Sequence, residues 1–310
     1  MRFCAQYPMP AAGGVSSADL AGDIAAYARA AEDAGFDGVA FTEHPAPSLK
    51  WMDSGGHSSL DPYAALAYVA AVTSRIRLVT FLVVLPYRNP MSTAKSAISV
   101  DVLSNGRLTL TCGTGYLRSE FGALGVDFDE RNELFNEALE VLNLAWQNPD
   151  AVAYEGKHFR AKEQSYRPAP IQDRAPLWIG GNSSVAKTRV AKYAVGWAPM
   201  LADPTVANTS RTPAITSVEQ LADHIVDVRE RVAAEGRDPS TIDICGGDGP
   251  AGGVVNHAGE WFKAEESLDW VGRMAEIGVT WINTGASSMD QSVNREALAA
   301  YGEQVIAKSR

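Results

Sequence analysis

The stretch "RLVTFLVVLP" at residues 77–86 is a continuous, mostly apolar run. Runs of this kind are typical of strands buried on both faces of a parallel sheet. Helical patterns flank it at 61–74 and 89–104, and each opens on a capping residue followed by proline, Asp61–Pro62 and Asn89–Pro90. The stretch therefore predicts a parallel strand between two crossover helices.

The same alternation of short apolar strands and longer helical patterns runs along most of the chain. The expected strands are 2–7, 38–44, 77–86, 108–115, 175–181, 196–200, 241–247 and 280–286. Eight such units in 310 residues predict an α/β protein with the (β/α)8 TIM-barrel fold, and the main rival is a doubly wound open sheet. We expect one barrel domain over 1–310, with irregular insertions near 148–174 and 201–216 that serve as lids or binding loops or are disordered.

Composition and residue spacing argue against several classes of ligand and partner. A net charge of −10 argues against nucleic-acid binding, which needs a basic face. The three cysteines lie apart in apolar stretches, which favours reduced core thiols, and the five histidines are scattered without metal-ligand spacing, so no metal site is expected. Without a signal peptide or an apolar run of about 20 residues, we expect a soluble cytoplasmic protein with no membrane partner.

The second expected strand, "GVAFTEH" at 38–44, ends on Glu43 and His44. In a barrel, the carboxyl ends of the strands converge on one face, where the active site is built. Imidazole exchanges protons near neutral pH, so His44 is a candidate proton donor or acceptor. Glu43 is a second catalytic candidate, although neighbouring strand residues point to opposite faces and its carboxylate could instead hold a backbone amide.

The fourth expected strand ends on a glycine turn, Gly113, Thr114 and Gly115, followed by Tyr116. Glycines allow a flat ligand or a phosphate to approach the backbone closely. The alternative is a tight turn at a crowded barrel mouth.

The fifth expected strand ends on Gly180 and Gly181, and Asn182 and Ser183 then open a helix. Free amides at a helix N-terminus bind phosphate well, so this segment is a candidate anion site. Ordinary N-capping by the serine is the alternative.

Several motifs together resemble the luciferase-like monooxygenase superfamily, over roughly residues 20 to 200. They include "AFTEHPAP", "SNGRLTLTCGTGYLRSEFGALGVDF" and "PLWIGGNS". The resemblance is closest to the branch that uses the deazaflavin coenzyme F420. It implies a (β/α)8 barrel that binds F420 or FMN at its mouth, with His44 beside the reactive ring. It also implies a non-proline cis peptide involving Thr80 and Phe81, the Gly113–Gly115 turn along the cofactor, and its phosphate at the Gly180–Gly181 segment.

The resemblance further implies a homodimeric oxidoreductase acting on a small organic substrate. In the F420 reading, a hydride passes to or from the substrate, with His44 exchanging a proton and Tyr116 helping. Sugar-phosphate dehydrogenases of this branch carry a glutamate where this chain has Tyr116, which argues against their substrate. The alternatives are an FMN-dependent monooxygenase that uses O2 and a separate flavin or deazaflavin reductase, and a non-catalytic flavin-binding protein.

Overall fold

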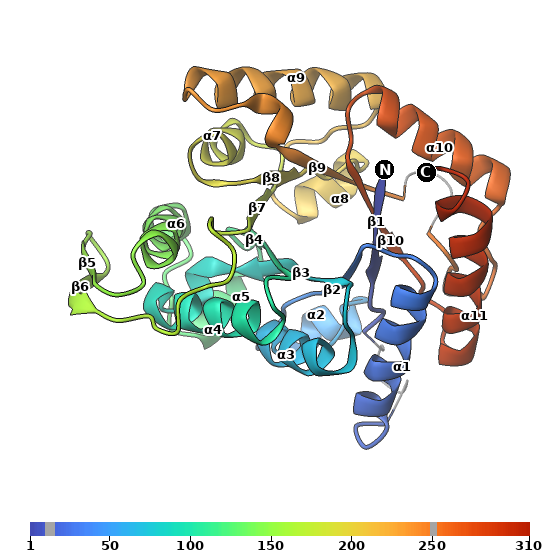
Figure 1. Ribbon diagram of the computed structural model, residues 1–310, viewed down its shortest axis with the longest axis horizontal. Coiled ribbons are helices and arrows are strands. Elements are labelled where there is room, and N and C mark those ends of the chain that lie inside the picture. The colour runs from blue at the N-terminus through green and yellow to red at the C-terminus, as the bar shows by residue number, and fades with distance from the viewer. Residues whose placement is uncertain (10–15, 249–252) are drawn as a thin grey trace.

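The computed structural model describes residues 1–9, 16–248 and 253–310 (Figure 1). Eight parallel strands close a barrel in the order β1-β10-β9-β8-β7-β4-β3-β2. Their bounds are β1 Arg2–Gln6, β2 Gly38–Phe41, β3 Arg77–Val84, β4 Leu108–Gly113, β7 Leu177–Gly180, β8 Gly196–Ala198, β9 Asp243–Gly247 and β10 Trp281–Gly285. The predicted (β/α)8 fold is confirmed, and each strand lies within a range expected from the sequence.

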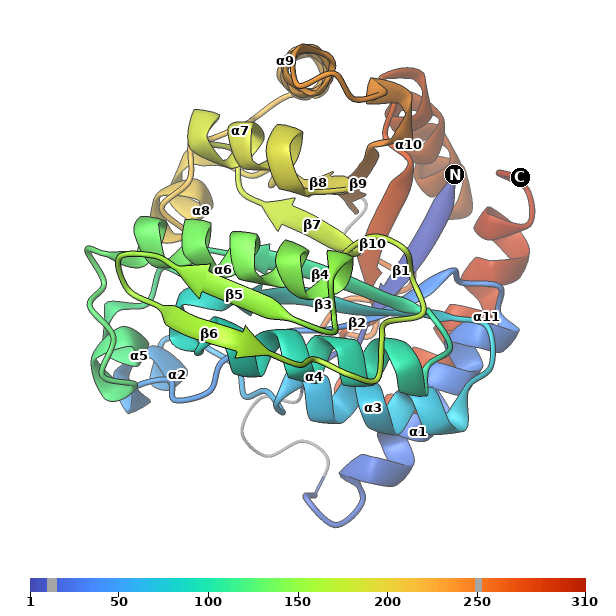
Figure 2. The ribbon, with the colours of Figure 1, turned by 60° about the vertical axis from the view of Figure 1, so that its left-hand side comes forward.

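Helices surround the barrel, and the longer ones cover the outer faces of its strands, whereas the short helices after β2, β4 and β8 lie beyond the carboxyl ends of the strands (Figure 2). They are α1 Leu20–Asp33, α2 Leu49–Asp53, α3 Pro62–Val72, α4 Pro90–Leu103, α5 Arg118–Ala123, α6 Arg131–Gln147, α7 Ser184–Tyr193, α8 Pro204–Thr209, α9 Val218–Ala234, α10 Ala264–Glu276 and α11 Gln291–Tyr301. The predicted caps form, since the Asp61 side chain accepts from the Ala64 amide and the Asn89 side chain from the Met91 amide. Among the described residues, no helix combines the length and apolar character needed to cross a membrane.

The interior of the barrel is packed near the N-terminal ends of its strands. Trp178 and Trp281 meet edge to face there, with ring centroids 5.3 Å apart. Cys4 and Cys245 belong to the same buried cluster and are free thiols, as expected. This packing closes one end of the barrel, so a ligand site is expected at the other end, where the strands finish.

The two insertions are more regular than the sequence suggests. Segment 148–174 contains an antiparallel hairpin, β5 Val152–Glu155 and β6 Arg160–Gln164, which lies against α6 (Figure 2). The buried Glu137 carboxylate of α6 accepts hydrogen bonds from the backbone amides of residues 157–159 at the hairpin turn. Segment 201–216 contains α8. Both segments therefore contain short regular elements that the sequence did not predict, because tertiary partners such as Glu137 stabilise elements with weak local patterns.

Candidate active site

Glu43 and His44 leave β2 toward different partners. Glu43 is 3% exposed, and its carboxylate accepts from the Val84 amide at 2.6 Å and from Arg88 Nε at 2.8 Å. Burial raises the pKa of Glu43, and the Arg88 charge acts in the opposite direction. Both carboxylate oxygens are therefore engaged in tying the end of β2 to the end of β3. Glu43 thus holds a backbone amide, which was the alternative to catalysis, and these contacts do not support a catalytic role for Glu43.

His44 is held by a carboxylate that the sequence reasoning did not select. His44 Nδ1 lies 3.2 Å from Glu120 Oε2, and Glu120 is only 1% exposed. The same oxygen accepts from the Tyr87 hydroxyl at 2.9 Å, while Oε1 accepts from the Ala46 amide at 3.3 Å. Burial and the Glu120 charge both raise the pKa of Tyr87, so its hydroxyl remains a donor. The contact with Glu120 fixes the orientation of the imidazole.

Glu120 lies in the first turn of α5, four residues after Tyr116. Tyr116, rather than a carboxylate, directly follows the Gly-x-Gly turn. The helical turn of α5 instead carries Glu120 back toward the end of β2. The sequence feature that points to Glu120 is the "EF" of the motif "GYLRSEF", which belongs to the resemblance described above.

Aromatic side chains surround the imidazole of His44. Its ring centroid lies 4.4 Å from that of Trp51, 4.9 Å from that of His57 and 6.3 Å from that of Tyr116. The backbone at Gly56 packs against the Trp51 indole so closely that a Cβ there would lie 2.3 Å from the ring. Burial lowers the pKa of His57, which favours its neutral form. Two histidines that look scattered in the sequence are thus neighbours.

A cavity of about 810 Å³ opens at the carboxyl ends of β1, β2, β3 and β10. Its lining includes His57, Phe81, Tyr7 and Asn283. The Asn283 side-chain oxygen is buried and has no hydrogen-bond partner among the described residues. A cavity with mixed aromatic and polar walls and an unpaired acceptor suits a flat heterocycle that carries N–H groups. This barrel-mouth cavity therefore fits a flavin-type ring.

The cis peptide expected in the third strand joins Phe81 to Leu82, one residue later than the predicted Thr80–Phe81 position. The Thr80 side chain is fully buried and donates to the Thr111 carbonyl at 2.7 Å. Phe81 lines the barrel-mouth cavity, so the structure brings only one of these two residues to its surface. Their predicted contacts with a cofactor stay predictions.

The glycine turn after β4 is shaped by close packing on β3. A Cβ on Gly113 would lie 2.9 Å from the Leu82 side chain, and a Cβ on Gly180 would lie 2.6 Å from it. Gly115 has a φ of +76°, which glycine adopts readily. Thr114, between the two turn glycines, is half-buried. The glycines are therefore required by a tight turn in a crowded part of the barrel mouth. Contact of the Gly113–Gly115 turn with a cofactor stays a prediction.

The segment after β7 is also engaged within the protein. The Gly181 amide donates to the Ala198 carbonyl, and the buried Asn182 side chain bonds the backbone of Met200 and Pro213. Ser183 caps α7 by accepting from the Ala186 amide, as the alternative reading expected. Anion binding at this segment stays a prediction for Gly180, Gly181, Asn182 and Ser183. Because the contacts above occupy their polar groups, an anion would bind the backbone amides of the first turn of α7.

A chain of contacts along the rim connects the surroundings of His44 to this segment. The Tyr116 carbonyl accepts from Arg211 Nε at 3.3 Å. The next residue, Thr212, accepts at its hydroxyl from the Asn182 amide at 2.8 Å. The ends of β2, β4 and β7 therefore share one continuous rim.

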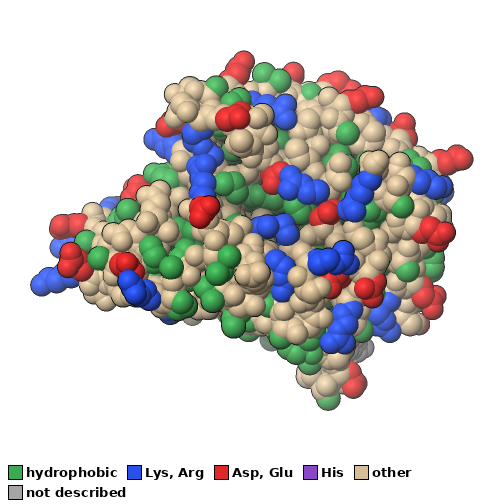
Figure 3. Space-filling view, in the orientation of Figure 1, with side chains coloured by type: hydrophobic (Ala, Val, Ile, Leu, Met, Phe, Trp, Pro, Cys, Tyr) green, Lys and Arg blue, Asp and Glu red, His purple; other side chains and the backbone are tan. Residues whose placement is uncertain are grey.

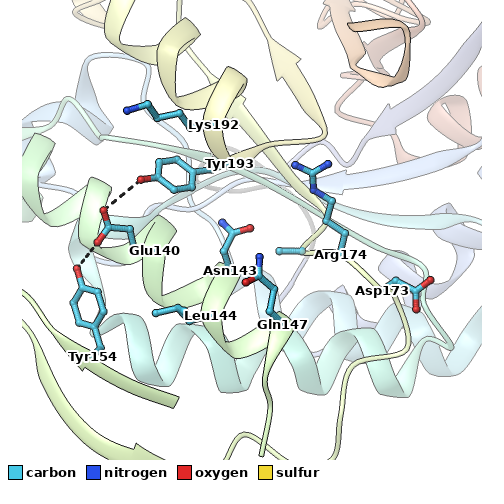
Figure 4. Close-up of a pocket in the computed structure, with 10 residues that line it drawn as sticks. Glu140, Asn143, Leu144, Gln147, Tyr154, Asp173, Arg174, Lys192 and Tyr193 are labelled. Atoms are coloured by element: carbon cyan, nitrogen blue, oxygen red, sulfur yellow. Dashed lines mark hydrogen bonds between the residues drawn. The ribbon is translucent and has the colours of Figure 1, made fainter. Parts of the chain in front are cut away.

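A second cavity of about 630 Å³ lies outside the barrel, between α6, α7 and the β5–β6 hairpin (Figure 4). Figure 4 shows Tyr154 and Tyr193 pointing at Glu140, to which they donate at 2.8 and 3.3 Å. These polar groups satisfy one another and lie on the outer helical layer. We therefore place the candidate active site at the barrel mouth.

Glu130, Glu133 and His158 bring three possible metal-ligand atoms within 4.8 Å of one another on the surface. The sequence predicts no metal site, and it did not anticipate this cluster because His158 belongs to the hairpin turn. The Lys157 ammonium already contacts both carboxylates. We assign the cluster no role in the reaction.

Comparisons with known proteins support the barrel fold and identify a family. A family described as luciferase-like monooxygenase matches residues 1–248. An uncharacterized protein of Mycobacterium tuberculosis (strain ATCC 25618 / H37Rv) is 27% identical over 299 residues, covering 92% of this chain and 93% of its own. The F420-dependent hydroxymycolic acid dehydrogenase of the same strain is 29% identical over 222 residues, covering 71% and 56%. The crystal structure of monooxygenase RslO1 from Streptomyces bottropensis matches with a TM-score of 0.83 at 20% identity over 100% of both chains, a likeness that shows the fold.

Proposed function

The chain belongs to the luciferase-like monooxygenase family, and from this premise we propose that it is an F420-dependent oxidoreductase acting on a small organic substrate. Family membership supports an oxidoreductase that uses a flavin or deazaflavin cofactor. The preference for F420 is supported by the similarity to an F420-dependent dehydrogenase. The observation that carries the proposal is the His44–Glu120 pair beside the barrel-mouth cavity.

In this proposal His44 exchanges the proton that accompanies the redox step. Glu120 accepts from Nδ1, so Nε2 is the nitrogen that exchanges a proton with the substrate. The buried Glu120 carboxylate holds the imidazole in the orientation and tautomer that leave Nε2 facing away from this contact. The bound deazaflavin would accept or donate the hydride at its central ring carbon.

Other side chains hold and shield the ring. Asn283 supplies a buried acceptor for a ring N–H, and Phe81 and Tyr7 contribute apolar walls. Trp51 and Tyr116 flank the imidazole and limit the access of water to it. Tyr116 is the candidate for a second proton donor, since burial and the Glu120 charge raise its pKa and keep its hydroxyl protonated.

The direct test titrates the apo-protein with F420 and with FMN in parallel. We expect tighter binding of F420, together with turnover of the reduced cofactor with members of a panel of carbonyl acceptors. Tighter binding of FMN and oxygen consumption with reduced flavin would favour the monooxygenase alternative. Binding without turnover would favour a non-catalytic flavin-binding protein.

The second test is His44→Ala, with His158→Ala as a control on the surface hairpin. We expect turnover to fall by about 10²- to 10⁴-fold, the usual contribution of a general acid or base, while the cofactor Kd changes little. The control should retain full turnover. Unchanged turnover in His44→Ala would remove His44 from the mechanism.

A further inference from the structure

The wall of the barrel-mouth cavity has no basic side chain among the residues that the structure describes. No lysine or arginine lines it, and residues 10–15 and 249–252 contain none in the sequence. Among the described lining residues, Asp53 supplies the one carboxylate. Lysine and arginine side chains are common elsewhere on the surface, as the face drawn in Figure 3 shows, and the chain has 27 of them. The cavity wall therefore disfavours anions.

His57, the half-buried histidine of this wall, does not supply the missing positive charge. Burial lowers the pKa of His57, which favours the neutral ring. Its Nδ1 lies 3.1 Å from the Ser58 carbonyl oxygen and donates to it, so Nε2 carries the lone pair of the neutral ring. A neutral imidazole in this tautomer offers an anion neither a charge nor a free N–H group.

Three methionines from distant segments line the same cavity. Met9 follows β1, Met52 lies in α2 and Met289 follows β10, and the whole chain has only seven methionines. Met289 is 59% exposed, although a large apolar side chain gains more from burial. Unbranched thioether side chains adapt to apolar groups of different shapes and are common on binding surfaces. The convergence of these methionines indicates an apolar ligand.

These side chains belong to the outer part of the cavity, which the loops and α2 form. Asp53 is exposed, whereas Asn283 on β10 is half-buried. In the proposed function the cofactor ring lies against the strands, where Asn283 offers its unpaired acceptor. The outer part is then the space for the substrate. The His57 ring lies 4.9 Å from that of His44, so a substrate against this wall lies near the proton-exchanging histidine.

We propose that the substrate is an uncharged, largely apolar molecule, and that Asp53 and the three methionines select it against anionic compounds of the same shape. The proposal rests on the proposed function, because it takes a cofactor ring against the strands as given. An anion in this space loses part of its hydration without gaining a cationic partner, and Asp53 repels it. An apolar group leaves water and gains contact with the methionine side chains.

The experiment compares two aldehydes of similar shape, 4-isopropylbenzaldehyde and 4-formylbenzoate, which carry an apolar or an anionic group opposite the aldehyde. NMR titration with oxidised F420 present measures the Kd of each at pH 8, where exposed histidines are neutral. The variants are Asp53→Lys, which adds a cation to the wall, and Met289→Gln, which makes it more polar at similar volume. Asp33→Lys is the matched control, because Asp33 ends α1 as Asp53 ends α2 and is also exposed, on a different part of the surface. Thermal unfolding verifies that each variant is folded.

We expect the wild type to bind the isopropyl compound about tenfold or more tightly than the carboxylate. Asp53→Lys should reduce this ratio about fivefold, Met289→Gln should weaken the isopropyl compound alone by about threefold, and Asp33→Lys should leave both Kd values unchanged. Equal or reversed Kd values in the wild type, binding of neither aldehyde, or equal shifts in the two lysine variants would overturn the proposal. If the preference holds but the reduced cofactor reacts with no acceptor of the carbonyl panel, the proposed function fails while the selectivity of the cavity stands.

Discussion

Replacing Glu120 with glutamine tests the central pair of the proposed active site. The Glu120 carboxylate accepts from His44 Nδ1, the Tyr87 hydroxyl and the Ala46 amide. A glutamine of similar volume has one acceptor oxygen and one donor group, so at least one of these three donors loses its acceptor. An unsatisfied buried donor costs about 1–3 kcal/mol, so Glu120→Gln should lower the free energy of unfolding by about that amount.

The effect on turnover follows from the same contact. A hydrogen bond to a charged group is worth about 1.5–3 kcal/mol, and the bond from His44 Nδ1 to the Glu120 carboxylate keeps the imidazole in the orientation that the reaction needs. Losing it during the reaction should lower kcat by about 10- to 150-fold, at 1.36 kcal/mol for each factor of ten. The cofactor Kd should change little, because Glu120 does not line the barrel-mouth cavity.

The matched control is Tyr87→Phe, which removes a donor to the same carboxylate oxygen and leaves the His44–Glu120 contact in place. We expect a loss of stability of about 1.5–3 kcal/mol, the value of a hydrogen bond to a charged group, with kcat within about threefold of the wild type because the His44–Glu120 contact remains. The assay follows cofactor absorbance during turnover, and 15N NMR of the His44 ring reports its tautomer. Equal losses of kcat in both variants, or an unchanged His44 spectrum in Glu120→Gln, would refute the assigned role of Glu120.

Three further substitutions test other parts of the structure. Arg88→Ala leaves the buried Glu43 carboxylate without its partner and should cost about 3–5 kcal/mol in chemical denaturation. Burial raises the pKa of Asp248 to about 7, so wild-type stability relative to Asp248→Asn should fall as the pH rises from about 4 to 7, by at most about 4 kcal/mol over these three pH units. Gly56→Ala should push the Trp51 indole off His44 and lower kcat, with a shift in tryptophan fluorescence.

Proton binding by Asp248 links the stability of the fold to pH. Its folded pKa lies above the unfolded value near 4, so the folded state holds the extra proton between the two values and its advantage is lost as the pH rises. A flat difference over this range would contradict the raised pKa of Asp248. For Gly56, the matched control is Gly22→Ala, because the space around Gly22 is open and the helix tolerates alanine. Equal losses of kcat in both glycine variants would exclude a specific effect on Trp51.

The barrel and its strands could be predicted from the sequence because they depend on local patterns. The apolar run at 77–86 and the caps at Asp61 and Asn89 each act within a few residues, and the structure contains the strand and both helices where they were expected. His44 could be selected for the same reason, since the end of a buried strand is visible in one short stretch.

The partners of these residues were decided only by the tertiary structure. Glu120 is 76 positions from His44 in the chain, and only the turn of α5 brings its carboxylate to the imidazole. Three arginines lie over the Phe128 ring because α5, α6 and the segment after α8 converge there, and they are Arg118, Arg131 and Arg211. Local sequence patterns specify which segments form strands and helices, whereas contacts between distant side chains depend on how those segments pack, and no short window of sequence contains that information.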